Sequence, residues 1–342
     1  MKTSLRGKIA LILLLVMTLF AVTASAAYPQ KPITLIVPYG AGGTADLTAR
    51  QLAIQLKKHL GMPITVINQG GASGSIGTRS ALNAPADGYT LLLSADSLGT
   101  QRVMGISEMS YADFRAITPL VNDPKVIVVA GDSAYQSIEQ LLEDIKARPL
   151  KVKMSYTGPG GSGHVQSLIY NRFGLKMALI AYPGGADALL AVLGKQVDFT
   201  NANFSTIRSY LDSGDLRLLA ISAAERLDAF PEVPALAEVI ENSTALMGFP
   251  YTPLSLVVNK AVPEEAFLAL REAIQKALLE PEWLAYCQDN ALDQLFLQYQ
   301  TEEEMQRFYA DWESLVSWLL YDAGAAPHSP AAFDIPRLEP GE

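Results

Sequence analysis

The sequence predicts an α/β fold built from parallel sheets. Short apolar runs rich in β-branched residues alternate with longer stretches of helical periodicity. Strands and helices in alternation indicate parallel sheets that are covered by helices on both faces. Glycine-rich loops follow several of the predicted strands. Ligands of such sheets bind beyond the carboxyl ends of the strands, so we expect these loops to surround a binding site.

The chain opens with the features of an export signal. Three basic residues precede the almost purely apolar run 9–22, and Ala24-Ser25-Ala26 fits a small-residue cleavage site. The apolar run is shorter than the ~20 residues that a membrane-spanning helix usually needs. We therefore expect residues 1–26 to be a cleaved signal peptide of a periplasmic protein, in preference to an uncleaved N-terminal anchor.

The first segment behind this signal, from Tyr28 to Asp46, is the most informative. Ile33–Val37 is a predicted strand, the loop 40–43 is glycine-rich, and a helix is predicted over Ala45–Leu60. A glycine turn that leads from a strand into a helix exposes backbone N–H groups at the positive end of the helix. The segment therefore predicts a binding site for a small anion.

The remaining elements continue the alternation, and glycine-rich loops recur at 70–77, 158–163 and 184–185. Two lobes with such loops facing each other would form a cleft. The predicted strands are Ile33–Val37, Ile64–Asn68, Tyr89–Ser94, Val126–Ala130, Lys151–Thr157, Ala178–Tyr182, Val197–Thr200, Leu216–Ser222 and Leu254–Asn259. The predicted helices are Ala45–Leu60, Ile76–Asn83, Ile138–Ala147, Val165–Phe173, Asp187–Gly194, Ser205–Leu211, Glu264–Leu279 and Glu302–Tyr321.

Composition argues against several function classes. The formal net charge is −9 and the chain has no basic cluster, which argues against a nucleic-acid partner. Cys287 is the single cysteine, so no intramolecular disulfide is possible, and we expect it to be a small buried hydrophobe in a helix. His59, His164 and His328 lack the spacing of metal ligands, so no metal is expected.

Motifs for catalysis are incomplete. The loop 158–163 matches the dinucleotide-binding pattern, but the acidic residue expected about 20 positions later is missing. No Walker A sequence occurs, and no serine lies in a G-x-S-x-G elbow. Ser162 and His164 lie at a predicted helix start, where a capping serine is the simpler interpretation. We expect a binding protein without a cofactor, not an enzyme.

Several side chains beside the loops have two interpretations. Asp46 either stabilises the first turn of its helix or accepts hydrogen bonds from a ligand or from bridging waters. Tyr39 and Tyr182 either wall the cleft or belong to the edge of the core. His164 either lines the cleft or makes a hydrogen bond at the helix start. Asn203 either donates to the ligand or caps a turn.

Longer strings carry a resemblance to a known family. They occur in order over nearly the whole predicted mature chain and read YPQKPITLIVPYGAGGTAD, VINQGGASGSIG, APADGYTLLLS, SYTGPGGSGHV, AYPGGADALLAVLGKQVDF and LRLLAISAAERLDAFPEVPALAE. The chain resembles the Bug family of extracytoplasmic solute receptors, which are the substrate-binding proteins of tripartite tricarboxylate transporters.

The resemblance implies a two-lobed periplasmic-binding-protein-like fold of type II, with the ligand in the inter-lobe cleft. Lobe 1 would comprise residues 27–123 plus 223–342, and lobe 2 residues 124–222. It also implies a monomeric receptor that binds a small carboxylate through loop amides, hydroxyls and ordered waters rather than an arginine. Such a receptor delivers its ligand to membrane transporter subunits; the alternative is a receptor that presents its ligand to a sensor protein.

The predicted ligand-binding residues come from both lobes, and three departures from the family pattern leave the usual dicarboxylate specificity open. Pro183 replaces a common lysine, Ala202 replaces the first residue of an Asp-Asn pair, and Gly248–Thr252 replaces a tryptophan-containing segment. The predicted site residues are Tyr39, Gly42, Gly43, Thr44, Asp46 and Ser94 in lobe 1, and Thr157, Gly158, Gly161, Ser162, His164, Tyr182, Gly184 and Asn203 in lobe 2.

Overall fold

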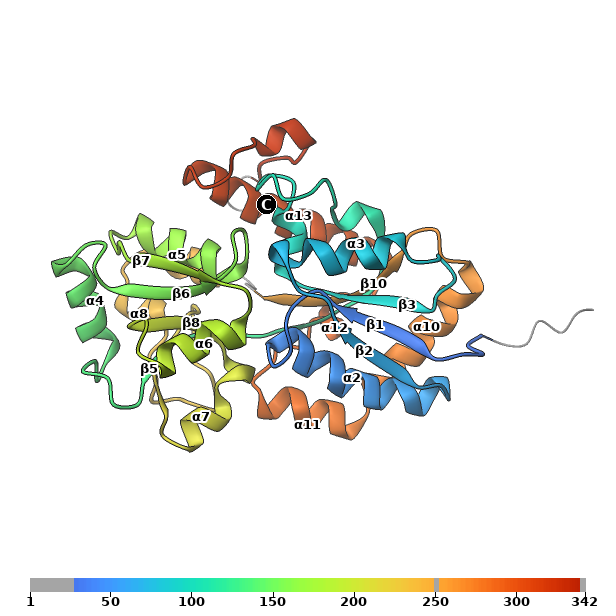
Figure 1. Cartoon of the computed structure of the whole chain (residues 1–342), viewed down its shortest axis with the longest axis horizontal. Coiled ribbons are helices and arrows are strands. Elements are labelled where there is room, and N and C mark those ends of the chain that lie inside the picture. The colour runs from blue at the N-terminus through green and yellow to red at the C-terminus, as the bar shows by residue number, and fades with distance from the viewer. Residues whose placement is uncertain (1–27, 249–251, 339–342) are drawn as a thin grey trace, which may run out of the picture.

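Two five-stranded sheets, each with helices packed on it, form two lobes that lie side by side (Figure 1). The structure is a computed structural model that describes residues 28–248 and 252–338. The predicted signal peptide 1–26 lies outside the described residues, as does most of the Gly248–Thr252 segment. The expectation of an α/β fold is confirmed.

The first sheet has the strand order β2-β1-β3-β10-β4. Its strands are β1 Ile33–Val37, β2 Ile64–Asn68, β3 Thr90–Ser94, β4 Phe114–Asn122 and β10 Pro253–Asn259. Its helices are α2 Thr44–Leu60, α3 Ser75–Asn83, α10 Glu264–Ala277, α11 Pro281–Asp289, α12 Leu295–Gln298 and α13 Glu302–Asp322. Short 3₁₀ helices are η1 Ala72–Gly74, η2 Asp96–Thr100, η3 Tyr111–Asp113 and η5 Pro330–Phe333.

The second sheet has the strand order β7-β6-β8-β5-β9. Its strands are β5 Lys125–Ala130, β6 Lys153–Thr157, β7 Ala178–Tyr182, β8 Phe199–Asn203 and β9 Leu216–Ile221. The helices of this part of the chain are α4 Ile138–Ala147, α5 Ser162–Arg172, α6 Gly185–Leu193, α7 Arg208–Asp212, α8 Leu236–Val239 and α9 Thr244–Met247, with the 3₁₀ turn η4 Phe204–Thr206.

Each sheet contains one strand that runs against its neighbours, so the expectation of wholly parallel sheets is wrong. β10 is antiparallel to β3 and β4, and β5 is antiparallel to β8 and β9. For β5 the reason is the path between the lobes. The chain passes from Asn122 at the end of β4 almost directly to Lys125 at the start of β5. β5 therefore begins beside the last residues of its neighbours β8 and β9, and it runs in the direction opposite to theirs.

The short helices α8, α9 and α12 were not predicted, and two longer segments also differ from the prediction. β4 was not predicted, because Pro119 lies inside it and proline within a run argues against a central strand. β4 is an edge strand that pairs with β10 alone, and the register shifts beside Pro119, so the missing N–H is tolerated. The helix predicted over Ser205–Leu211 is wrong as a single element, because a 3₁₀ turn precedes the shorter α7.

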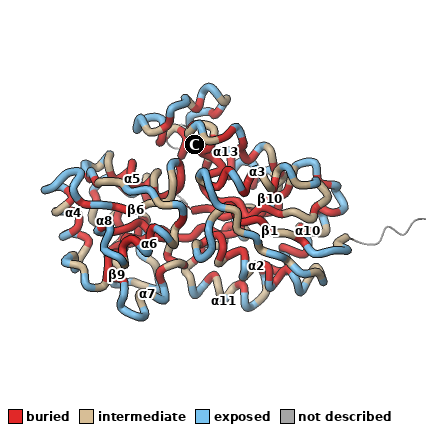
Figure 2. Tube along the Cα trace, viewed as in Figure 1, coloured by how far each residue is buried: buried red, intermediate tan, exposed pale blue. Residues whose placement is uncertain are grey.

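Buried residues run along the strands and alternate with exposed residues along the helices (Figure 2). One hydrophobic cluster joins β1, β3 and β10 to α2, α10 and α11, and a second joins β5 and β8 to α6. Cys287 on α11 is fully buried in the first of these clusters. Between residues 28 and 338, leaving out the undescribed 249–251, no helix combines the length and hydropathy needed to cross a bilayer.

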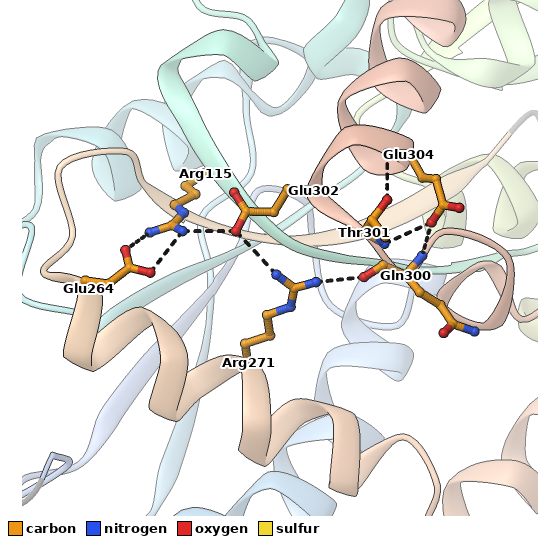
Figure 3. Close-up of polar contacts among 7 residues, drawn as sticks. All are labelled: Arg115, Glu264, Arg271, Gln300, Thr301, Glu302 and Glu304. Atoms are coloured by element: carbon orange, nitrogen blue, oxygen red, sulfur yellow. Dashed lines mark hydrogen bonds and ion pairs between the residues drawn. The ribbon is translucent and has the colours of Figure 1, made fainter.

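The long C-terminal helix α13 is fixed to the first lobe by a polar network at its start (Figure 3). Thr301 and Glu304 form a capping box, with Thr301 N–H donating to Glu304 Oε2 at 2.9 Å and Glu304 N–H donating to Thr301 Oγ1 at 3.2 Å. Glu302 Oε1 accepts from Arg115 at 3.0 Å and from Arg271 at 3.3 Å. The network therefore ties α13 to both β4 and α10.

The link between β9 and β10 stays with the second sheet for part of its length. Ile221 donates its N–H to Pro234 O at 2.9 Å, and Ala237 donates to Ala223 O at 3.4 Å. Leu236 and Met247 are buried in a cluster that also contains Ile127 of β5. The boundaries of 123/124 and 222/223 between lobes stay predictions.

Candidate functional site

The loop between β1 and α2 is shaped by its glycines and by Asp46. Gly42 has φ +80°, in the left-handed region, and its N–H donates to Asp46 Oδ2 at 2.9 Å. Asp46 Oδ1 also pairs with Arg50 at 2.8 Å. Burial opposes ionisation of Asp46, but the hydrogen bonds from Arg50 and Gly42 outweigh it, so the pKa of Asp46 is lowered. Asp46 therefore braces the loop from within.

Asp123 joins the two lobes at the crossing from β4 to β5. Thr44 Oγ1, at the start of α2, donates to Asp123 Oδ2 at 2.8 Å. Ser205, which follows β8, donates its N–H to Asp123 Oδ1 at 3.3 Å. Its hydroxyl also donates a hydrogen bond to Asp123 Oδ2. Burial raises the pKa of Asp123, although the bonds from Ser205 and Thr44 act in the opposite direction.

The glycine-rich loop between β6 and α5 lies against the first lobe. Gly158 and Gly160 have positive φ. A Cβ on Gly158 would lie 2.7 Å from the hydroxyl of Ser73, and a Cβ on Gly160 would lie 2.6 Å from the hydroxyl of Thr100. Thr100 Oγ1 donates to Gly160 O at 2.9 Å. His164 Nδ1 accepts the Gly160 N–H at 3.1 Å. Glycine is therefore needed here for the close approach of the two lobes.

Asp96 reaches across the cleft to the start of α5. It follows β3 in the first lobe, and its side chain accepts the backbone N–H of Ser162 in the second lobe. Asp96 is 7% exposed. Burial raises the pKa of Asp96, while the positive charge of Lys125 and the Ser162 N–H act in the opposite direction. A carboxylate of the protein therefore occupies the positive N-terminal end of α5.

Lys125 places a cation at the cleft from the first residue of β5. Lys125 is 5% exposed, and its Nζ donates a hydrogen bond to Asn203 Oδ1 at 2.5 Å. Burial lowers the pKa of Lys125, while the carboxylates of Asp96 and Asp123 oppose this change. The Nδ2 group of Asn203 is buried without a hydrogen-bond partner among the described residues. Lys125 and Asn203 therefore present donors to the cleft.

The cleft between the lobes is a small cavity of about 70 Å³. Of the predicted site residues, its lining includes Tyr39, Gly43, Thr44, Thr157, Ser162 and Asn203. A neighbouring cavity that shares Tyr39 and Thr157 is also lined by Gly158, Gly161 and Tyr182. The predicted residues outside both linings are Gly42, Asp46, Ser94, His164 and Gly184.

The structure bears on the alternative interpretations of three predicted side chains. Asn203 makes no capping hydrogen bond to the turn that follows it. Ser162 is also not a cap, because Gly161 occupies that position before α5. His164 supports the loop through Gly160 and stacks on Tyr156, with ring centroids 5.3 Å apart, and burial lowers its pKa.

Sequence reasoning missed the two charged side chains that line the cleft, Asp96 and Lys125. The available signals were a polar residue just beyond β3 and a lysine at the start of the apolar run of β5. In the described part of the chain, no group of three or more His, Cys, Asp and Glu side chains is placed to hold a metal ion.

The family model described as "Tripartite tricarboxylate transporter family receptor" matches residues 48–317. The chain belongs to this receptor family. Protein BugT of Bordetella pertussis is 35% identical over 241 residues, which are 66% of this chain and 73% of BugT. The structure of the periplasmic binding protein BugD is 26% identical and has a TM-score of 0.80, covering 87% of this chain and 99% of BugD.

The fold extends to more distant proteins. The R. palustris protein Rpa4515, whose structure is described as being with adipate, is 22% identical and has a TM-score of 0.80. The match covers 88% of this chain and 100% of Rpa4515. It shows likeness of fold.

Membership in the tripartite tricarboxylate transporter receptor family confirms three predictions. The resemblance to Bug receptors is confirmed, the fold is the two-lobed type II fold, and the chain is a binding protein and not an enzyme. The family consists of extracytoplasmic receptors, and membership implies a small carboxylate ligand and a membrane transporter as partner.

Proposed function

We propose that this receptor is exported to the periplasm, captures a small carboxylate between its lobes and delivers it to the membrane subunits of a tripartite transporter. The observation that carries the proposal is the position of Lys125, a buried cation that donates a hydrogen bond to Asn203, on the lining of the inter-lobe cleft. The start of α2 lines the same cleft through Gly43, Thr44 and Ala45, so the positive N-terminal end of this helix and the Lys125 cation share one cavity.

The proposed ligand contacts are those predicted side chains and backbone groups that line the cleft, with Lys125 added. Gly42 and Asp46 support the first loop from behind, and His164 supports the second. Closing the lobes on a carboxylate would surround it with donors from both sheets, which is how a receptor of two rigid lobes retains a small ligand.

Binding without turnover tests the receptor part of the proposal. Small carboxylates should raise the melting temperature because they bind the folded state. The ligand should be recovered unchanged after hours of incubation. Its consumption by pure protein would contradict the assignment as a receptor.

Export and delivery need measurements in cells. The intact mass of periplasmic protein should correspond to cleavage near Ala26, and retention of Met1 on a membrane-bound species would contradict export. Deletion of the gene should abolish uptake of the carboxylate that binds in vitro, with rescue by wild type. Undiminished uptake in the deletion strain would contradict delivery to a transporter.

A further inference from the structure

The charges at the cleft are unbalanced toward the negative. The charged side chains on its described lining are Lys125 and Asp96. A second carboxylate, that of Asp123, lies near enough to Lys125 to influence it electrostatically and is fully buried. One cation therefore faces two carboxylates of the protein before any ligand enters.

The two helix ends at the cleft are not equally available to an anion. At α5, the Ser162 N–H already donates to the Asp96 carboxylate. At α2, the Asp46 carboxylate accepts a hydrogen bond from the Gly42 N–H, which belongs to the preceding loop and not to the helix. The first-turn residues Thr44 and Ala45 line the cleft. The first N–H of α5 is thus used by the Asp96 carboxylate, whereas at the start of α2 the Asp123 carboxylate accepts from the Thr44 hydroxyl and the backbone of Gly43, Thr44 and Ala45 lines the cavity.

Donors from Lys125, Asn203 and the start of α2 line the same cavity. Lys125 Nζ has a hydrogen bond to Asn203 Oδ1, and an ammonium group has two further N–H donors. The buried Nδ2 of Asn203 has no partner among the described residues. A carboxylate between Lys125, Asn203 and the start of α2 would satisfy these donors, because it offers two oxygens with about four acceptor positions.

We propose that this cleft selects ligands with a single carboxylate and that Asp96 excludes di- and tricarboxylates. The inference rests on the proposed function as a carboxylate receptor and names the class of carboxylate. Lys125 and Asn203 hold the one carboxylate. A second carboxylate pointed at α5 would meet Asp96 at a position whose N–H donor is already used, and like charges brought together in a buried interface are strongly unfavourable.

The test compares chain-matched ligands on the full mature receptor by calorimetry and thermal shift. The probes are the straight-chain monocarboxylates from propionate to hexanoate and the dicarboxylates from succinate to adipate. The tightest monocarboxylate should bind wild type at least ~10-fold more tightly than any dicarboxylate. A dicarboxylate as the tightest wild-type ligand would overturn the inference, and this comparison needs no variant.

Two variants test the residues. Asp96→Asn should raise dicarboxylate affinity at least ~10-fold relative to monocarboxylate affinity, and Lys125→Met should lower both. Controls of the same type are Asp132→Asn and Lys195→Met, which remove the charges of an exposed ion pair away from the cleft. A ratio of mono- to dicarboxylate affinity that is unchanged in folded Asp96→Asn would remove Asp96 from selection. No binding of either class to wild type would instead contradict the proposed function itself.

Discussion

At the scale of single residues, the ionisation of Lys125 should govern how binding depends on pH. Burial lowers its pKa below the ordinary 10.5 in the free receptor, with Asp96 and Asp123 opposing that change. A bound carboxylate stabilises the ammonium form and raises the same pKa. Between the free and bound pKa values, binding takes up a proton, so affinity must fall as pH rises through this window.

We therefore expect the affinity for a carboxylate to decrease on the alkaline side, beginning below the ordinary pKa of lysine. Calorimetry in buffers of different ionisation heat would detect the proton uptake. Lys125→Met should bind more weakly and lose this alkaline decrease. The same decrease in Lys125→Met would assign the pH dependence to another group.

Gly43 is where a side chain should block the ligand without harming the fold. Its φ of −84° and ψ of 168° are open to any residue, and an added Cβ would meet nothing closer than Gly40 O at 3.9 Å. Gly43 also lines the cleft. Gly43→Val should abolish carboxylate binding and leave a folded receptor, with a modest fall in the ligand-free melting temperature because valine is a poorer N-cap of α2 than glycine, and Gly43→Ala should be intermediate in binding. Calorimetry showing wild-type affinity in Gly43→Val would remove this loop from the site.

At the scale of elements, the network at the start of α13 should contribute modestly to stability and not to binding. Glu302 accepts from Arg115 and Arg271, but its side chain is 42% exposed, so solvent screens both pairs. Glu302→Gln should lower the free energy of unfolding by about 0.5–1 kcal/mol, with a smaller effect at high salt.

The neighbouring Glu303 provides the matched control, because its contact with Arg307 is 3.9 Å long and highly exposed. Glu303→Gln should leave the urea midpoint of unfolding unchanged. Equal losses of unfolding free energy in the two variants would show that the ion pairs of Glu302 contribute no more than the removal of any negative charge at this end of α13.

The elements also show which features the sequence could predict. Gly43 was predictable because a glycine turn between a strand and a helix leaves a local pattern. Lys125 was not, because a lysine before an apolar run usually marks a solvated strand end, and its burial depends on Asn203, 78 residues away. β4 was missed because Pro119 is tolerated only at a sheet edge, a position that depends on β10 arriving from much later in the chain.

At the scale of the whole molecule, the lobes already touch through direct hydrogen bonds. Ser73 Oγ donates to Pro159 O at 3.0 Å, Thr100 Oγ1 donates to Gly160 O, and Thr44 Oγ1 lies 3.2 Å from Ser205 Oγ. A ligand that contacts both lobes binds this closed arrangement better than an open one and shifts the population toward it.

Small-angle scattering should therefore show a smaller radius of gyration at saturating carboxylate than without it. Thr157→Ala combined with Asn203→Ala should lower affinity steeply if both lobes share the ligand. An unchanged scattering profile together with unchanged affinity in this double variant would mean that one lobe holds the ligand alone.

The buried thiol of Cys287 can report when α11 detaches from the first lobe. Burial raises the pKa of this thiol to about 12, and its residue is fully enclosed between α11 and the rest of the first core. Since the chain has one cysteine, every labelling event reports the same place. Modification by a thiol reagent should require α11 to detach, and its rate should give the free energy of that local opening. Rapid labelling of the native receptor would show that α11 separates far more readily than its packing implies.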